Sequence, residues 1–217
     1  MAQIDVFFDA LLEFKGSDLH LTTGNPPLIR INGELESLDY PPLVDSELTE
    51  MLYEICPGDK IAQFQECGDI DFALGFGDKA RFRANYFQQS KGIASVFRTI
   101  PAKILTAEDL GLPAICRKFA GLKKGLVVVT GPTGCGKSTT LAAIIDQANR
   151  TRSDHILTIE DPIEFVHKSK KALVNHREVG GHTKSFASAL RGALREDPDV
   201  ILVGEMRDLE TISLALE

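Results

Sequence analysis

The sequence predicts two domains in tandem, an α+β domain followed by an α/β domain. In residues 1–100, helical patterns are mixed with short alternating strand patterns that are separated by glycine-containing turns. After residue 125, strand and helix patterns alternate regularly, which is typical of a parallel sheet with crossover helices. The chain has 217 residues, enough for one large domain or two small ones.

The elements of the first domain follow from the spacing of its apolar residues. Apolar side chains at helical spacing predict helices over 3–14, 46–56 and 59–66. Alternating side chains predict strands over 18–22, 28–31, 70–75, 80–87 and 93–100. Ser46 is the expected N-cap of the second helix, and Asn32-Gly33 favours a tight hairpin turn after the second strand.

Residues 101–124 are expected to connect the two domains and to contain one helix that is capped by Thr106. The second domain covers 125–217. Its predicted elements are strand 126–130, helix 137–149, strand 155–160, helix 183–195 and strand 199–204. This order is expected for a RecA-like α/β domain. A last helical pattern in 208–217 has no stop signal, so we expect the chain to end inside this domain.

Composition argues against several classes of protein. The net charge is −7 and no long basic run is present, which argues against a nucleic-acid-binding surface as the main function. No apolar run reaches the ~20 residues of a membrane span, and acidic residues in the first helix exclude a signal peptide. The cysteines form no C-x-x-C pair and indicate reduced thiols in the cytosol. They are Cys56, Cys67, Cys116 and Cys135.

The run 131–138, Gly-Pro-Thr-Gly-Cys-Gly-Lys-Ser, fits G-x-x-x-x-G-K-[ST] at every fixed position. It lies between a predicted strand and a predicted helix, as this phosphate-binding loop requires. Lys137 is expected to reach the β- and γ-phosphates of ATP, and the Ser138 hydroxyl to ligate Mg²⁺. The expected nucleotide-binding residues of the loop are Gly131, Pro132, Thr133, Gly134, Cys135, Gly136, Lys137, Ser138 and Thr139.

Two carboxylates follow predicted strands of the second domain. Glu160 closes the strand 155–160, and Glu205 follows the strand 199–204. Ligands of open α/β sheets bind outside the carboxyl ends of the strands, so both acids are candidates for activating water or holding Mg²⁺. The alternative is that they are ordinary loop carboxylates.

Three arginines of the first domain are candidate phosphate ligands. Arg81 and Arg83 point to one face of their strand because side chains alternate, and Arg98 lies on the following strand. Guanidinium groups give permanently charged, bidentate contacts to phosphates. From these residues alone, solvated surface charge is the better interpretation.

Several segments together resemble the secretion-ATPase superfamily of type IV pilus and type II secretion motors. Residues 131–143 resemble its phosphate loop, 155–167 its Asp box, and 190–208 its atypical Walker B region. Residues 16–21 and 81–101 are similar to it as well. Within the superfamily, the match is to the retraction ATPases of twitching motility.

This resemblance implies a cytosolic ring hexamer that drives pilus retraction with ATP and Mg²⁺. The N-terminal domain would be PAS-like, the second RecA-like, and ATP would lie between them, approached by Arg81, Arg83 and Arg98. Glu160 would be the catalytic acid or base and Glu205 the Walker B ligand of Mg²⁺ or water, although the two roles could be exchanged. The implied partner is an inner-membrane pilus platform protein, with peripheral membrane association and no direct contact to nucleic acid.

The sequence departs from the family in two places. The family continues into a His-box strand and a C-terminal helical region, so we expect this chain to bind ATP and to turn over poorly. Cys135 replaces a family serine, and its alkylation is expected to block nucleotide binding. The alternatives are a pilus-extension or type II secretion ATPase, a DNA-linked RecA-type ATPase and a non-hydrolysing nucleotide sensor. A start directly at the N-terminal domain favours retraction over extension.

Overall fold

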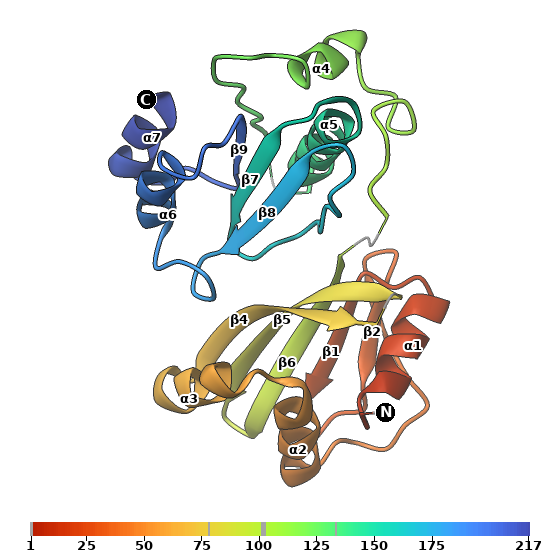
Figure 1. The fold of residues 1–217 in the computed structure, drawn as a ribbon. Coiled ribbons are helices and arrows are strands. Elements are labelled where there is room, and N and C mark those ends of the chain that lie inside the picture. Colours follow the sequence, from red (N-terminus) through yellow and green to blue (C-terminus); the bar gives the residue numbers. More distant parts are fainter. Residues whose placement is uncertain (1, 78, 101–102, 133) are drawn as a thin grey trace. The chain divides into compact units, whose positions relative to one another are not determined.

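The computed structural model describes residues 2–77, 79–100, 103–132 and 134–217 (Figure 1). Pro101 and Ala102, at the start of the expected connector, lie outside these residues, as does Thr133 of the glycine-rich loop. The chain divides into two compact units, residues 1–101 and 102–217. Among the helices that are described, none has the length and apolar character needed to cross a membrane.

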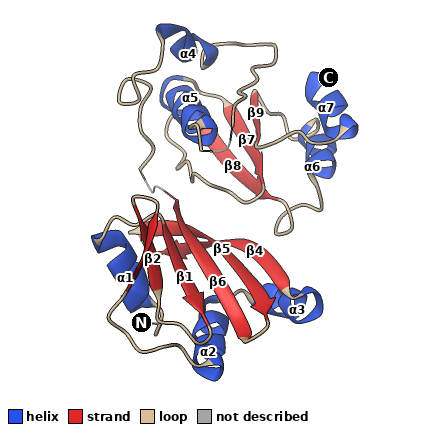
Figure 2. Cartoon of the chain, turned by 180° about the vertical axis from the view of Figure 1, so that it is seen from behind, coloured by secondary structure: helices blue, strands red, loops and turns tan. Residues whose placement is uncertain are grey.

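The first unit is a six-stranded antiparallel sheet of order β3-β2-β1-β6-β5-β4 (Figure 2). The strands are β1 (Asp18–Thr22), β2 (Leu28–Ile31), β3 (Glu34–Ser37), β4 (Asp69–Phe76), β5 (Ala80–Gln89) and β6 (Gly92–Ile100). The helices are α1 (Asp5–Glu13), α2 (Asp45–Ile55) and α3 (Gly58–Cys67). The predicted hairpin is confirmed, because Asn32 and Gly33 both have positive φ and β3 pairs with β2.

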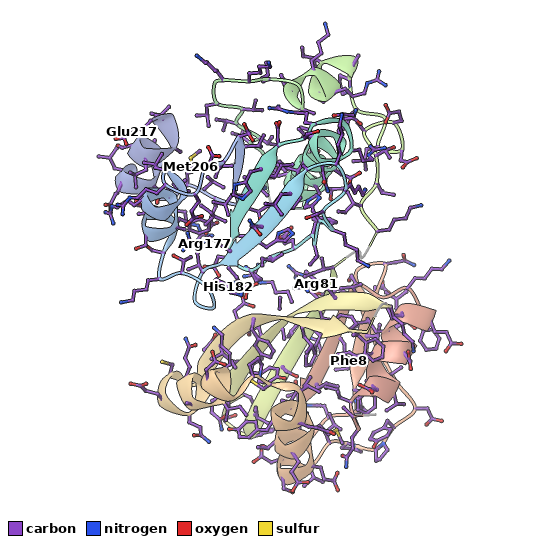
Figure 3. The ribbon with its side chains drawn as sticks, viewed as in Figure 1. Phe8, Arg81, Arg177, His182, Met206 and Glu217 are labelled. Carbon is purple, nitrogen blue, oxygen red and sulfur yellow. The ribbon has the colours of Figure 1, made fainter. Side chains whose placement is uncertain are left out.

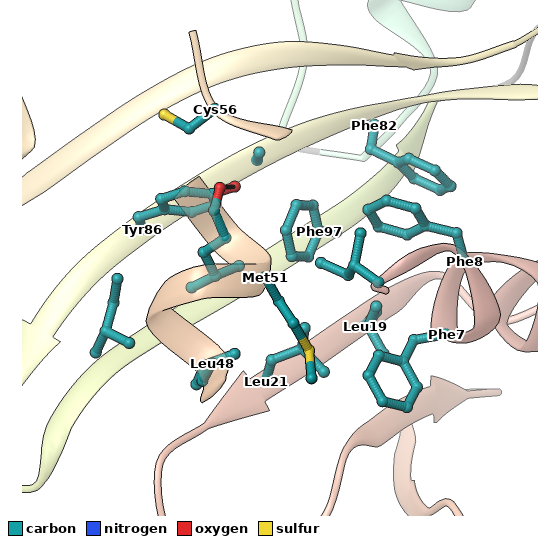
Figure 4. Close-up of a cluster of buried hydrophobic side chains, with 14 of the residues drawn as sticks. Phe7, Phe8, Leu19, Leu21, Leu48, Met51, Cys56, Phe82, Tyr86 and Phe97 are labelled. Carbon is teal, nitrogen blue, oxygen red and sulfur yellow. Dashed lines mark hydrogen bonds between the residues drawn. The ribbon is translucent and has the colours of Figure 1, made fainter. Parts of the chain in front are cut away.

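One aromatic core holds this unit together (Figure 4). Alternate residues of β5 point inward, among them Phe82 and Tyr86. The ring of Phe8 on α1 stacks on Phe82 with centroids 4.4 Å apart and meets Phe97 edge-on at 5.0 Å. The buried Tyr86 hydroxyl donates to the Leu52 carbonyl at 3.1 Å, so the phenol of this core residue is satisfied.

The expected cap of α2 is wrong. The N-cap residue is Val44, which makes no side-chain cap bond, and Ser46 lies inside the first turn. The neighbouring carboxylate of Asp45 is used elsewhere: its Oδ1 accepts from the Ile93 N–H at 2.9 Å and from the Thr23 hydroxyl at 3.0 Å. A tertiary link between the helix start and the sheet therefore replaces a local cap.

The second unit contains a parallel three-stranded sheet of order β8-β7-β9. Its strands are β7 (His155–Glu160), β8 (Leu173–Glu178) and β9 (Val200–Val203). Its helices are α4 (Ala114–Phe119), α5 (Lys137–Thr151), α6 (Phe186–Ala193) and α7 (Leu209–Leu216). Residues of α5 pack with Ile156 of β7, and residues of α6 pack with Leu157 and Ile159, so the two helices cover opposite faces of the sheet.

The expected strand 126–130 is not formed. Among the described residues the sheet ends at β9, and the Leu126 and Val128 side chains are 48 % and 56 % exposed. A β-branched run becomes a strand only when a neighbour supplies hydrogen bonds and packing, and here it has neither.

Two other local expectations need correction. Thr106 exchanges hydrogen bonds with Asp109, but they close a turn, and the connector helix begins at Ala114 after Pro113. Strand β8 was not predicted, because polar residues at 175–178 hide its alternation. The other predicted helices and strands of this unit are confirmed to within a few residues.

Candidate active site

The glycine-rich loop leads directly into α5. Gly134 and Gly136 have φ of 78° and 93°, a region that favours glycine. At Gly131 an added Cβ would lie 2.6 Å from the Cys135 sulfur, so a side chain there would collide with the loop itself. The backbone conformation of the loop therefore favours glycine, and the loop leads into the N-terminus of α5, where the helix dipole favours an anion.

Lys137 is the first residue of α5, and its ammonium lies over the loop. The Nζ atom donates to the Gly131 carbonyl at 3.0 Å and to the Pro132 carbonyl at 2.9 Å. Ser138 and Thr139 follow in the first helical turn and are half-buried. These contacts hold one positive charge beside the N–H groups that would receive phosphate oxygens.

Glu160 ends β7 and is 8 % exposed. Burial raises its pKa from the ordinary value of 4.5 to about 7, and repulsion from Glu164 and Glu178 adds to the rise. The Thr158 hydroxyl and the Glu164 N–H, which is 3.4 Å from Oε2, offset part of it. A carboxylate with a pKa near neutrality is suited to accept a proton from a reacting water.

The second acid lies at the end of the neighbouring strand. Glu205 follows β9, which pairs with β7, and its half-exposed carboxylate forms an ion pair with Arg207 at 2.9 Å. Between the two acids, the Gly204 N–H donates to the Ile159 carbonyl at 2.8 Å. A Cβ added to Gly204 would lie 3.4 Å from Glu160 Cα, which is ordinary van der Waals contact, so the ends of β7 and β9 lie close together.

The loop after Glu160 is attached to α5 by two buried polar residues that the sequence analysis missed. Asn149 donates from Nδ2 to the Lys168 carbonyl at 2.8 Å and accepts the Lys170 N–H at Oδ1, 3.0 Å away. Asp146 binds the Lys170 ammonium at 2.6 Å. The sequence could have revealed these contacts, because polar residues on the buried face of a predicted helix need hydrogen-bond partners. The helix that starts at the phosphate loop thus also holds the segment that follows Glu160.

The three candidate arginines belong to the first unit. Arg83 and Arg98 lie directly opposite each other on β5 and β6. Each pairs with a carboxylate, Arg83 with Asp71 and Arg98 with Asp18, the latter at 2.8 Å. Arg81, labelled in Figure 3, has an Nε atom that is buried and makes no hydrogen bond within the described part of the chain. The structure brings these arginines to one sheet and gives two of them internal partners.

The loop, the lysine and serine at the start of α5, and the acids at the strand ends define a P-loop nucleotide-binding protein. The family described as type II/IV secretion system protein matches residues 68–217. The chain belongs to this family.

Relatives and solved structures are similar over nearly the whole chain. It is 54 % identical to the type IV pilus retraction ATPase PilT of Pseudomonas aeruginosa over 200 residues, 92 % of this chain. It is 48 % identical to a twitching motility protein of Neisseria gonorrhoeae over 97 % of this chain. The chain spans 58 % of the length of each of these relatives.

Two solved structures share the fold. A crystal structure of the pilus retraction motor PilT with bound ADP has a TM-score of 0.92 and 48 % identity, covering 98 % of this chain and 62 % of that one. The ATPase DotB of Legionella pneumophila has a TM-score of 0.81 and 34 % identity, covering 97 % of this chain and 61 % of the other. These matches support the expected α/β ATPase domain.

Proposed function

We propose that this chain is the nucleotide-binding part of an ATPase motor that retracts type IV pili. One observation carries the proposal: a complete phosphate loop and a buried strand-end glutamate occur in a chain 54 % identical to a retraction ATPase. The ADP bound to a structural neighbour supports a nucleotide as the ligand of this fold.

The loop 131–139 would bind the phosphates of MgATP. Lys137 would exchange its two carbonyl partners for β- and γ-phosphate oxygens, since an ammonium group prefers charged acceptors. The Ser138 hydroxyl and the Glu205 carboxylate would hold Mg²⁺, directly or through water, because hard oxygen donors suit this cation. When bound, the metal neutralises charge that develops on the phosphates.

Glu160 would act as the general base. As the water oxygen attacks the γ-phosphorus, one proton passes from that water to the Glu160 carboxylate, and the bond between the γ-phosphorus and the bridging oxygen of ADP breaks. The raised pKa supports this role, because a stronger base accepts the proton more readily. Glu205 is the alternative base, since it ends the adjacent strand.

The first unit would act as a PAS-like domain that supplies Arg81, Arg83 and Arg98 to the nucleotide. Arg83 and Arg98 would exchange Asp71 and Asp18 for phosphate oxygens, and an arginine that completes such a site contributes about 10³–10⁵ in rate. The motor would be a homo-hexamer in the cytoplasm that acts on an inner-membrane pilus platform protein. The names of two relatives, a type IV pilus retraction ATPase and a twitching motility protein, support the part of this assignment that concerns pilus retraction.

Binding of a fluorescent ATP analogue with Mg²⁺ tests the site. Lys137→Ala should weaken binding by about 10²-fold or more, because the phosphates lose a charge-assisted contact worth ~3 kcal/mol. The exposed Lys184→Ala is the matched control and should bind normally. Equal affinity in both variants would contradict the assignment of the loop.

The direction of the motor is tested in cells that lack the gene. We expect many surface pili and no twitching, because pili assemble and cannot be withdrawn. Complementation with the wild-type gene should restore motility, and complementation with Glu160→Gln should not. Bald cells would instead indicate an extension or secretion motor, and the ATPase assignment would stand.

A further inference from the structure

Four polar side chains share one face of the strand pair β7–β8. In the parallel register, Thr158 lies opposite His176 and Glu160 lies opposite Glu178. Since alternate residues of a strand point to the same side and directly paired residues share it, all four project from one face. The proposed general base therefore has a histidine and a second glutamate as its neighbours.

The imidazole of His176 lies between the carboxylate and the loop that follows β7. Its Nδ1 atom is 2.8 Å from the Thr158 hydroxyl and 4.0 Å from Glu160 Oε1. Its Nε2 atom is 3.1 Å from the backbone nitrogen of His167 and 3.2 Å from the carbonyl of the same residue. Because His167 offers both a donor and an acceptor, Nε2 has a hydrogen-bond partner with or without a proton. The site can thus hold His176 neutral or charged.

Glu160 has an oxygen that such a histidine could satisfy. Its Oε1 atom is buried and has no partner of full hydrogen-bond geometry among the described residues, although the Thr158 hydroxyl is close enough to lower the pKa of this carboxyl. A buried unpaired carboxylate oxygen is costly, and a positive charge nearby lowers that cost. Two acidic neighbours have the opposite effect: Glu164 and Glu178 repel the carboxylate, and Glu178 Oε2 accepts the Ile163 N–H at 2.9 Å.

The second histidine does not take this role. The ring of His167 stacks beside His176 with centroids 6.0 Å apart. Burial lowers the pKa of His167 to about 4, and the charge of His176 lowers it further, while Asp146 opposes and Lys170 adds to the effect. At neutral pH His167 is therefore uncharged and supplies no positive charge to Glu160.

We propose that His176 is a positioning residue that shares one proton with Glu160 through the Thr158 hydroxyl and so keeps the carboxylate ionised for the next turnover. The proton that Glu160 takes from water passes to Thr158 Oγ1, while the hydroxyl proton of Thr158 passes to His176 Nδ1. Only O–H and N–H bonds change, and the products are a carboxylate and an imidazolium. The idea rests on the proposed role of Glu160 in hydrolysis.

The first test is an NMR titration of the Glu160 carboxyl carbon in the 217-residue chain, which needs no turnover. His176→Gln keeps a polar group between Thr158 and His167 and cannot become charged. We expect it to raise the pKa of Glu160 by about one unit, as loss of a neighbouring positive charge does. His155→Gln, at the other end of β7, is the matched control and should leave that pKa unchanged. An unchanged pKa in His176→Gln would overturn the proposal.

A second measurement uses the wild-type chain and does not depend on whether a variant folds. If the two groups share a proton, the Glu160 carboxyl and the His176 ring should report the same two inflections. One independent inflection for each group would overturn the proposal.

Hydrolysis by the assembled protein separates this idea from the proposed function. His176→Gln should move the acidic limb of the kcat profile to higher pH by about one unit with little change in KM. A uniform loss of kcat at every pH would assign His176 a purely structural role. Absence of ATPase activity in the wild type would defeat the proposed function, while the titrations would still decide the proton sharing.

Discussion

The two units of this chain use their buried space differently. The first has one core in which seven aromatic rings are in contact around Phe8, Phe82 and Tyr86. The second has two smaller clusters, rich in alanine and branched aliphatic residues. Its buried polar residues include Asp146, Asn149 and Glu160. The tightly packed core and the buried ionisable groups therefore lie in different parts of the chain.

The charged groups follow the same division. In the first unit, Arg83 and Arg98 lie on the polar face of the sheet and pair with acids there. In the second, Glu160 and His167 are buried, and burial shifts both pKa values toward the uncharged form. A buried group whose charged form is disfavoured lowers the stability of the fold and is more reactive. Replacing such a group by a neutral one should therefore raise the free energy of unfolding of the second unit, whereas truncating a core ring should lower that of the first.

The largest expected effect is in the aromatic core. Phe8→Ala should lower the free energy of unfolding of the first unit by about 4 kcal/mol, because it removes a fully buried ring and leaves a cavity. Urea unfolding followed by circular dichroism measures this loss. Phe14→Ala, at the exposed end of the same helix, is the control and should cost under about 1 kcal/mol. Equal losses of unfolding free energy in the two variants would contradict the claim that the buried ring of Phe8 stabilises this core.

The next effect has the opposite sign. Glu160→Gln should stabilise the second unit by about 3 kcal/mol near pH 8 and by little near pH 4. The pKa of Glu160 is raised on folding, so the wild type loses stability as pH rises from the ordinary value of 4.5 to about 7. Thermal unfolding across this pH range measures the difference.

An exposed glutamate serves as the control for that experiment. Glu66→Gln on α3 should shift the melting temperature little and with no comparable dependence on pH. A Glu160→Gln variant less stable than the wild type near pH 8 would show that the carboxylate stabilises the fold. It would contradict the claim that buried ionisable groups destabilise the second unit.

A smaller effect is expected at the start of α6. The Ser185 hydroxyl accepts the Ser188 N–H at 3.1 Å, so Ser185→Ala should cost about 1 kcal/mol in the free energy of unfolding of the second unit. Ser188→Ala keeps that N–H and should cost less than half as much. If the two variants are equal by urea unfolding, the cap does not stabilise this helix.

The smallest expected effect tests whether residues 126–130 form a buried strand. Val128→Ser should change the free energy of unfolding by under about 0.5 kcal/mol, because the side chain is 56 % exposed. A loss above about 1.5 kcal/mol would mean that the segment is packed as a buried strand, as the sequence predicts.

The sequence predicts those elements whose own residues show a clear pattern, and it fails where an element depends on its neighbours in the fold. Strands β1, β5 and β7 have clear patterns of their own and were predicted closely. Strand β8 was missed because its last residues are polar on both faces, and one face is polar because it borders Glu160. The strand 126–130 has the right composition and lacks a partner, which composition does not reveal.

The site shows the same limit. The loop 131–138 could be read from spacing alone, because its glycines are required by backbone conformation. The position of Glu160 at a strand end was also predictable, and its burial was not. That burial depends on Gly204 and on the segment after β7, which come together only in the folded unit.

Asn149 has a consequence for how freely this protein can vary. It is fully buried, and its amide supplies a donor and an acceptor to two backbone groups of one loop. Aspartate would set a carboxylate oxygen against the Lys168 carbonyl, and alanine would leave both groups unsatisfied. In a saturation library selected for folding, position 149 should therefore accept almost no replacement, even though it lies near the end of α5 that is far from the phosphate loop.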